Sequence, residues 1–340
     1  MAKQLVTNFI TQKVENFQLT EKCSATAVKT LLLSQKILNE DEKNVLRGYQ
    51  KITKITGSGK FRVATIEYSD NIGRLNASIV GEANPGMVQM YLNNSIKCNI
   101  LNGVYSDLDI VSCHPTIILQ LCEIYSLPTT NIKKLLFSTE LNLSKIDKLT
   151  IMYGGSLKRK DTIDIEKEIH DNATSLLLSF PEFLVHARTN TKKNYNVVGS
   201  AFSFLIQTIE KQIAMKMIKY IQNETTCIVG AYIYDGLHIE GDATEIIDMV
   251  QKHINTTTPF NIKLKIKPFQ ASAFLHEPIV VQHDYEAAQV ILNGITKNSL
   301  VRCDGRLYYK IEKCFTSNDL IIDPALLKHV MSQDLFLEKN

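Results

Sequence analysis

Apolar residues recur every three or four positions in several segments of the chain, a spacing typical of amphipathic helices. Residues 1–49 predict short helices, and longer helices are predicted over residues 160–180 and 201–222. In the last of these, Gln207 and Glu210 lie off a continuous apolar stripe. The stripe consists of Phe202, Leu205, Ile209, Ile213 and Met217. A large helical fraction is therefore expected.

A shorter predicted helix, within "NLSKIDKLTIMYGG", carries two lysines. Ser144 and Asp147 predict a capping box at its start, and the glycine pair after Tyr153 predicts its end. Helical geometry puts Lys145, Lys148 and Tyr153 on one broad face. Taken alone, two such lysines are most often a solvated helix face.

Runs of β-branched residues broken by turns predict strands elsewhere. Residues 51–100 predict a small sheet or hairpins. The stretch "GSGK" at residues 57–60 lacks the flanking glycine and hydroxyl residue of a phosphate-binding loop, so it is predicted as a hairpin turn. The stretch "NIKLKIKP" alternates apolar residues with Lys263, Lys265 and Lys267, which predicts an edge strand with a solvated basic face.

Two further predicted strands carry carboxylates. "YSDLDI" places Asp107 and Asp109 on one face of a strand. In "CIVGAYIYDGLHIEG" two apolar runs flank an Asp-Gly pair, which predicts a β-hairpin with Asp235 at its tip. A plain turn would be the simpler explanation of Asp235 if nothing else in the chain matched it.

Composition limits the classes of protein that the chain can represent. It has 340 residues, 44% of them hydrophobic, so it can bury a large core. A net charge of +3 permits a nucleic-acid partner without requiring one. The seven cysteines form no CxxC pair, which argues against a zinc ribbon or a disulfide framework. No apolar run reaches the length of a membrane span, so we expect an intracellular, soluble protein with no membrane partner.

The order of these elements predicts an α+β fold in three parts. Residues 1–100 form an N-terminal part with helices and hairpins, and residues 101–275 contain the carboxylates and the lysine-bearing helix. Residues 276–340 carry a second Asp-Gly hairpin and two short helices, which predicts either a small accessory module or the start of a region that continues in a longer parent chain.

Three features need one explanation: the strand with Asp107 and Asp109, the helix with two lysines, and the hairpin with Asp235. Carboxylates on rigid strands from distant parts of a chain are what a two-metal phosphoryl-transfer site requires. Lysine neutralises a triphosphate, and a tyrosine ring can stack on a base or sugar. Together, Asp109, Asp235, Lys145 and Tyr153 predict a phosphoryl-transfer site whose ligand has a triphosphate and a base or sugar.

These residues resemble a known family. "DIVSCHPT" from Asp109, "KIDKLTIMYGGS" and "YIYDGLHIE" resemble motifs A, B and C of the family A DNA polymerases and the single-subunit phage-type RNA polymerases, in the correct order. The chain most resembles the transposon–virophage polymerases, a derived family A branch usually fused to a superfamily 3 helicase. The resemblance covers about residues 60–270.

The resemblance implies a right-hand polymerase with an antiparallel palm sheet, helical fingers and a small N-terminal thumb-like part. It implies that Asp109 and Asp235 are catalytic and bind two Mg²⁺ ions, for which Mn²⁺ is a substitute, with Asp107 as a further candidate ligand. The nucleotide would contact a second set of residues. This set is Ser112, the sugar-facing His114, Lys145, Lys148 and Tyr153.

Nucleic-acid contacts are implied by weaker matches. "IGRLNAS" resembles the Gly-Arg-Leu stretch before motif A, which makes Arg74 a nucleic-acid contact, and Gln207 matches a minor-groove contact before motif C. Leu141 stands where motif B has an arginine, so either Lys148 or the run Lys158-Arg159-Lys160 is expected to bind phosphate instead.

The implied partners are a DNA template and primer, dNTP or NTP, and a superfamily 3 helicase in the same parent chain, at a viral replication site in the host cytoplasm. The function is then a DNA polymerase or primase in viral or mobile-element replication. Two alternatives stay open: a metal-dependent nuclease, and a non-catalytic nucleic-acid-binding module for a helicase. His114 could equally be a hydrogen-bonded core histidine.

Overall fold

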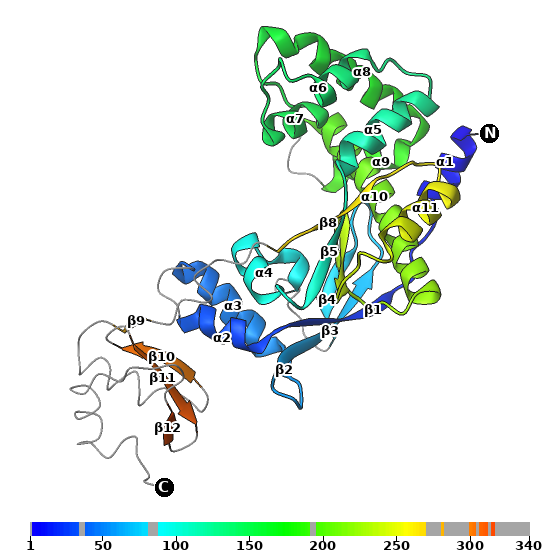
Figure 1. Cartoon of the computed structure of the whole chain (residues 1–340). Helices are drawn as coiled ribbons and strands as arrows, with labels where there is room; N and C mark the ends of the chain where they lie inside the picture. Colours follow the sequence, from blue (N-terminus) through cyan, green and yellow to red (C-terminus); the bar gives the residue numbers. More distant parts are fainter. Residues whose placement is uncertain are drawn as a thin grey trace.

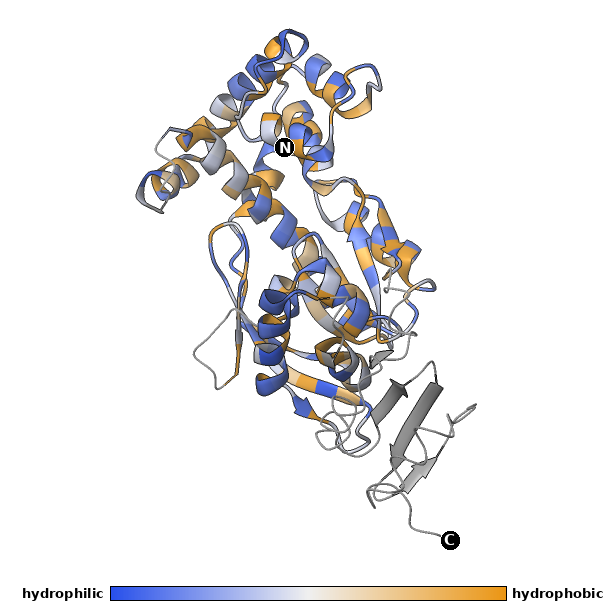
Figure 2. Cartoon of the chain, turned by 90° about the vertical axis from the view of Figure 1, so that its left-hand side faces the viewer, coloured by the Kyte–Doolittle hydropathy of each residue, from blue (hydrophilic) through white to orange (hydrophobic). Residues whose placement is uncertain are grey.

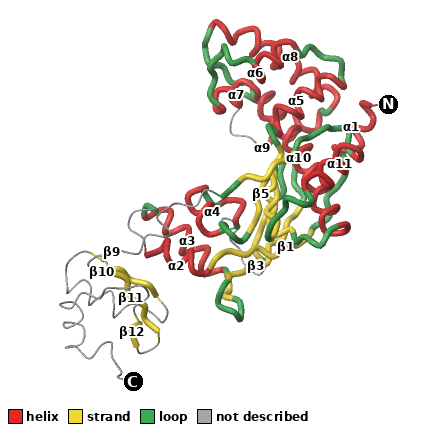
Figure 3. The backbone as a smooth tube through the Cα atoms, viewed as in Figure 1, coloured by secondary structure: helices red, strands yellow, loops and turns green. Residues whose placement is uncertain are grey.

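The fold is α+β (Figure 1). The computed structural model describes residues 2–33, 38–80, 88–190 and 195–269, and four short strands after them. Helices and strands occupy separate regions, with the strands between two groups of helices (Figure 3). No helix among these residues is both long and apolar enough to cross a membrane.

The central sheet has the strand order β6-β7-β5-β8, and every neighbouring pair is antiparallel. Its strands are β5 (Tyr105–Ile110), β6 (Val229–Ile233), β7 (Gly236–Glu240) and β8 (Leu264–Lys267). In this register Asp109 lies opposite Gly236 on one side and Lys265 on the other. The carboxylate-bearing strand is therefore an inner strand, flanked by the β6–β7 hairpin and by the basic strand.

A second antiparallel sheet is formed by the N-terminal part of the chain. Its strands are β1 (Phe17–Ser24), β2 (Lys54–Ile55), β3 (Phe61–Ser69) and β4 (Asn76–Ile79), with β1, β2 and β4 all paired to β3. The β2–β3 hairpin confirms the predicted turn at residues 57–60. The prediction of only helices over residues 1–49 was wrong at β1, where Leu19, Glu21 and Cys23 are buried at every second position, as in a strand.

Helices cover both sheets. Besides α1 (Ala2–Ile10), α2 (Ala25–Leu33) and α3 (Glu40–Ile52), the chain forms η2 (Gln89–Tyr91), α4 (Asn94–Ile100) and α11 (Ile247–Thr257). Helix α4 lies in a segment predicted as sheet. It begins at Asn93, whose side chain accepts a hydrogen bond from the backbone of Ile96, a local signal that overrides the β-branched composition.

A helical lobe follows the central strand β5. It comprises α5 (Cys113–Ile124), α6 (Thr130–Phe137), α7 (Lys145–Met152), η3 (Lys160–Thr162), α8 (Ile163–Ser179) and α9 (Pro181–Asn190) (Figure 1). Figure 2 shows hydrophobic and hydrophilic residues mixed along most helices, as expected where each helix buries one face. The predicted helices at residues 145–153 and 160–180 are confirmed within a few residues.

The longest helix, α10 (Val197–Glu224), runs from the helical lobe to the central sheet. It begins four residues earlier than predicted, because Asn196 caps it by accepting a hydrogen bond from the backbone of Gly199. Its middle is buried on all sides, so polar residues off the apolar stripe, including Glu210, are also inside the protein.

One hydrophobic core joins α1, the second sheet, the central sheet and the helical lobe. A smaller core lies among α2, α3 and α4. Residues on both sides of position 100 contribute to the larger core, so this part of the molecule packs as one unit. The division into residues 1–100, 101–275 and 276–340 stays a prediction.

The four strands after residue 269 form another small sheet. They are β9 (Val280–Val281), β10 (Ser299–Cys303), β11 (Arg306–Ile311) and β12 (Cys314–Thr316). The antiparallel β10–β11 pair confirms the strands of the second predicted hairpin, whose Asp-Gly turn lies outside the described residues. The two short helices predicted near it also lie outside them.

Candidate active site

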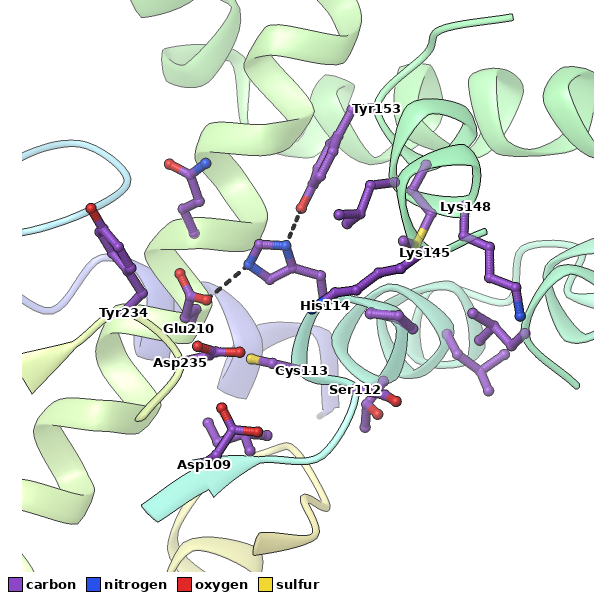
Figure 4. A pocket seen from close by; sticks show the side chains of 18 of the residues that line it. Asp109, Ser112, Cys113, His114, Lys145, Lys148, Tyr153, Glu210, Tyr234 and Asp235 are labelled. Atoms are coloured by element: carbon purple, nitrogen blue, oxygen red, sulfur yellow. Dashed lines mark hydrogen bonds and ion pairs between the residues drawn. The ribbon is translucent and has the colours of Figure 1, made fainter. Parts of the chain in front are cut away.

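A cavity of about 910 Å³ opens between the central sheet and the helical lobe (Figure 4). It is lined by residues from β5, α5, α7, α10, β8 and the β6–β7 hairpin. The predicted site residues among them are Arg74, Asp109, Ser112, His114, Lys145, Lys148, Tyr153, Gln207 and Asp235. Asp107, Lys158 and Arg159 do not line it. The fold thus brings together most of the residues singled out from the sequence.

Backbone pairing places Asp109 beside Asp235. Asp235 lies at the tip of the hairpin, as predicted, and its carbonyl accepts a hydrogen bond of 3.0 Å from the backbone of Ile110. The turn residues are Tyr234 and Asp235, because Ile233 pairs with Gly236, so Gly236 belongs to the strand. The Asp-Gly pattern located the hairpin correctly but placed its turn one residue late.

Gly236 is needed for close approach of the strands. A Cβ atom at this position would lie 2.6 Å from the carbonyl oxygen of Leu108, one residue before Asp109. The strain of the turn falls on Tyr234 instead, which has a left-handed φ of 52°. The glycine therefore holds the two catalytic candidates together.

The carboxylates of Asp107 and Asp109 on β5 and of Asp235 in the hairpin turn have different surroundings. Burial raises the pKa of Asp235, and the nearby charges of Asp109 and Glu210 raise it further. Burial also raises the pKa of Asp107 to about 6, although Lys267 opposes this effect. Asp109 is 5% exposed and accepts a hydrogen bond of 2.6 Å from Lys267 Nζ. The charges of Asp107, Asp109 and Asp235 thus all act on Lys267, which donates its hydrogen bond to Asp109.

Lys267 corrects one prediction. We expected Lys263, Lys265 and Lys267 to form the solvated face of an edge strand, and β8 is an edge strand. However, Lys265 and Lys267 line the cavity. Burial lowers the pKa of Lys267, but the hydrogen bond to Asp109 and the negative charges of Asp109, Asp235 and Asp107 together outweigh burial, so the net shift is upward. Reading these lysines as solvent-facing was therefore wrong for Lys267.

His114 connects the helical lobe to α10. Its Nε2 lies 2.9 Å from Oε1 of Glu210, and its Nδ1 lies 2.5 Å from the hydroxyl of Tyr153 (Figure 4). Since a carboxylate oxygen accepts, Nε2 donates to Glu210 and Nδ1 accepts from Tyr153. His114 is thus both a hydrogen-bonded histidine and a residue of the cavity wall.

Glu210 was not assigned a role from the sequence. It is 1% exposed and also pairs with Arg74, whose Nε lies 3.4 Å from Oε2. The available signal was a glutamate within a helix too apolar to be a surface helix, because a buried carboxylate requires partners. Periodicity alone could not identify those partners.

Arg74 and Gln207 meet at the same wall. The Arg74 guanidinium lies 4.0 Å from the centre of the Tyr234 ring, a cation–π distance. The preceding Gly73 donates a backbone hydrogen bond of 3.0 Å to the Thr208 hydroxyl on α10. Gln207 donates to Ser203 at 2.9 Å and lines the cavity. Two predicted nucleic-acid contacts are therefore held next to the Asp235 hairpin.

Helix α7 supplies the cations of the opposite wall. Its capping box is formed as predicted, with Asp147 accepting from the Ser144 backbone at 3.0 Å. Lys145 is exposed at the first turn and Lys148 lies one turn further along. The helix ends at Tyr153, whose carbonyl accepts a hydrogen bond of 2.9 Å from Asn196. Figure 4 shows the two lysines across the cavity from Asp109 and Asp235.

Two predicted phosphate-binding residues lie elsewhere. Arg159 pairs with Asp161 at 2.6 Å and donates to the carbonyl of Leu141 at 3.0 Å. Lys158 has a left-handed φ of 56° in the same loop. The loop is outside the cavity wall. A role of Lys158 and Arg159 in binding phosphate stays a prediction.

The donor set fits a divalent ion only in part. Within the described part of the chain, no three or more His, Cys, Asp or Glu side chains are arranged to hold a metal ion. Asp109 and Asp235 supply the carboxylate oxygens that Mg²⁺ prefers, and Mg²⁺ sites are commonly completed by water and substrate phosphates. The arrangement therefore fits an ion whose coordination is completed by water or by a phosphate ligand.

Comparison with known proteins finds matches among solved structures only. No protein-family model matches the chain, and no curated protein matches it. Among solved structures, it is similar to the POL domain of Pol1 from M. smegmatis, in complex with a DNA primer-template and dNTP. The similarity has a TM-score of 0.41 and 11% sequence identity, and covers 68% of this chain and 52% of the other. The chain therefore spans about half the length of that chain, and the similarity assigns no residue a role.

Proposed function

We propose that this chain is a DNA polymerase-like nucleotidyltransferase that copies a template at the cavity between the central sheet and the helical lobe. The supporting observation is the convergence of Asp109 and Asp235, which are more than a hundred residues apart, opposite Lys145 and Lys148 in one cavity. The motif order of the sequence independently points to the same reaction.

In this proposal the central sheet is the palm, the helical lobe is the fingers and residues 1–100 are the thumb-like part. Lys145 and Lys148 bind the triphosphate, because an ammonium group is a good point charge for phosphate oxygens. His114, held by Tyr153 and Glu210, faces the sugar. Ser112, at the start of α5, lines the cavity beside it.

Asp109 and Asp235 would hold the divalent cation; the motif resemblance implies two Mg²⁺ ions, with Mn²⁺ as a substitute. When bound, a divalent ion would lower the pKa of a primer 3′-hydroxyl and stabilise the charge of the departing pyrophosphate. Arg74 and Gln207 contact the primer-template, next to the hairpin that carries Asp235.

The resemblance to the transposon–virophage polymerases extends the proposal. It adds primer synthesis, a superfamily 3 helicase in the same parent chain reached through residues 276–340, and replication of viral or mobile-element DNA in the host cytoplasm. These additions rest on the motif resemblance alone.

A metal-dependent nuclease is the second candidate, because it would use the same two carboxylates. It would have no use for the two lysines of α7 facing them across the cavity. A non-catalytic DNA-binding module is the third, and it would have no use for buried carboxylates beside a hairpin tip.

The three candidates separate in one set of reactions. A labelled primer-template is incubated with Mg²⁺, with and without dNTPs or NTPs, alongside an unprimed control. Asp109→Asn and Asp235→Asn are compared with Asp248→Asn, an exposed aspartate on α11 that serves as the control. We expect synthesis that only the first two variants lose. Shortening of the primer without nucleotides would favour the nuclease, and DNA binding without any reaction would favour the binding module.

A further inference from the structure

We propose that the ammonium group of Lys267 permanently occupies the place of one of the two cations at Asp109, so that the site takes up one divalent ion per chain. The inference rests on the proposed function for the identity of the reaction. Its geometric basis and its test are independent of that reaction.

The Lys267–Asp109 pair is part of the sheet. Lys267 Nζ lies 2.6 Å from Oδ1 of Asp109, and the two residues belong to neighbouring strands with a fixed register, β8 and β5. The Asp109 side chain is only 7% exposed, and that of Lys267 is 42% exposed. An ion entering at this oxygen must displace a charge-assisted hydrogen bond from a carboxylate that has little access to water.

The other carboxylates leave few ligands for two ions. Both oxygens of Glu210 are in use, one with His114 and one with Arg74. Asp107 does not line the cavity, and its Oδ1 lies 4.0 Å from Nε2 of His238. Within the described ranges, the Asp235 carboxylate has no ion pair. Asp235 and the second oxygen of Asp109 are therefore the protein ligands that remain, which is enough for one ion completed by water or phosphate.

The charges of the site lead to the same conclusion. The cavity wall carries three carboxylates, Asp109, Glu210 and Asp235, and five cationic side chains, Arg74, Lys145, Lys148, Lys265 and Lys267. Cationic side chains therefore outnumber carboxylates before any metal binds. A second divalent ion would lie next to the ammonium group of Lys267 and be repelled by it.

Lys267 also differs from the exposed basic residues around it. Its neighbour on the same strand face, Lys265, is exposed, and no ion pair is found for it in the described ranges. A lysine that served only solubility would be expected to remain in solvent, as Lys265 does. The burial of Asp109 against Lys267 is therefore the specific feature that the proposal explains.

The test is a titration of the purified chain with Mn²⁺, in which free Mn²⁺ is measured by electron paramagnetic resonance. Neither DNA nor nucleotide is present. We expect one ion per natural chain. For Lys267→Met we expect a second ion, or affinity for the first increased at least tenfold. Lys252→Met removes the same charge from an exposed position on α11 outside the cavity and should behave like the natural chain.

Two ions in the natural chain, or none up to millimolar Mn²⁺, would overturn the proposal, and this result does not depend on whether Lys267→Met folds. Equal stoichiometry and affinity in the natural chain and a folded Lys267→Met variant would also overturn it. Lys267→Arg, which keeps the charge, should again bind one ion. Failure of the extension reaction would remove the proposed function but leave these results unchanged.

Discussion

The imidazole of His114 lies 2.9 Å from the carboxylate of Glu210, which links the start of α5 to the middle of α10. His114 lies five residues after Asp109 in the sequence. The carboxylate of Glu210 that it contacts also pairs with Arg74. It explains how a histidine can have a fixed orientation at the cavity wall. The proposed nucleotide contact His114 and the proposed primer-template contact Arg74 are therefore coupled through one buried side chain, Glu210.

Replacing Glu210 by glutamine tests this coupling. Glu210→Gln removes the charge that both Arg74 and His114 contact, so His114 should lose its fixed orientation. We expect the KM for nucleotide to rise about tenfold with a smaller change in kcat, because hydrogen bonds to charged groups contribute about 1.5–3 kcal/mol. Glu224→Gln, an exposed change on the same helix, is the control. Unchanged kinetics in Glu210→Gln would show that the contact has no positioning role.

Lys148 on helix α7 and Lys158 in the loop after this helix are expected to differ in their effect on nucleotide binding. Lys148 lines the cavity and Lys158 does not. Lys148→Ala should weaken nucleoside triphosphate binding about tenfold, the typical scale of a lost charge-assisted contact, whereas Lys158→Ala should change it less than about twofold. Fluorescent-nucleotide binding measures both affinities under the same conditions. A larger loss for Lys158 would mean that phosphate binds to the 156–160 loop instead.

Gly236 should tolerate no side chain. Gly236→Ala would put a Cβ 2.6 Å from the carbonyl oxygen of Leu108, so β7 and β5 would have to separate. We expect a loss of about 1–3 kcal/mol in the free energy of unfolding, the usual cost of overpacking. Gly57→Ala, where no atom lies within 4 Å of the added Cβ, should have little effect. Urea denaturation compares the two, and equal midpoints would contradict the close approach.

Glu21 predicts a pH dependence of stability. Burial raises its pKa to about 8, although hydrogen bonds from the Gln89 backbone and the Tyr68 hydroxyl oppose the shift. The folded chain then retains a proton that the unfolded chain loses above about pH 4.5. Stability should therefore decrease as pH rises from about 4.5 to about 8, by up to about 5 kcal/mol, and level off above that.

Glu21→Gln should flatten this dependence and give a higher unfolding midpoint than the natural chain at pH 9. The exposed change Glu15→Gln should leave the dependence unchanged. Thermal unfolding followed by circular dichroism from pH 5 to pH 9 measures it. If the unfolding midpoint of the natural chain rose between pH 5 and pH 8 relative to that of Glu21→Gln, Glu21 would not be protonated in the folded chain.

Local sequence signals predicted the parts of the site that local chemistry determines. The capping box of Ser144 and Asp147 gave the start of α7, and two apolar runs gave the hairpin of Asp235. Asp109 and Asp235 could be brought together because Asp109 lies on a strand and Asp235 at the tip of a hairpin, and β5 pairs with β7 of that hairpin. These features depend on periodicity and on residues within a few positions.

The features that were missed depend on contacts between distant segments. Nothing near Lys267 in the sequence indicates that β8 pairs with β5, which is what brings its ammonium group to Asp109. Glu210 acquires its partners only when α10 crosses both the Arg74 turn and the start of α5. Strand β1 was hidden by a polar sequence whose buried positions include Glu21. Packing, and not local propensity, decides each of these.

Incorporation of a single nucleotide tests whether the chain copies a template with the help of Asp235. A primer-template with one defined templating base is mixed with Mg²⁺ and each dNTP in turn, and the natural chain is compared with Asp235→Asn and Asp248→Asn. We predict addition of only the complementary nucleotide by the natural chain and Asp248→Asn, and none by Asp235→Asn although it still binds the DNA. No incorporation by the natural chain, or equal incorporation by Asp235→Asn, would contradict template-directed synthesis at this cavity.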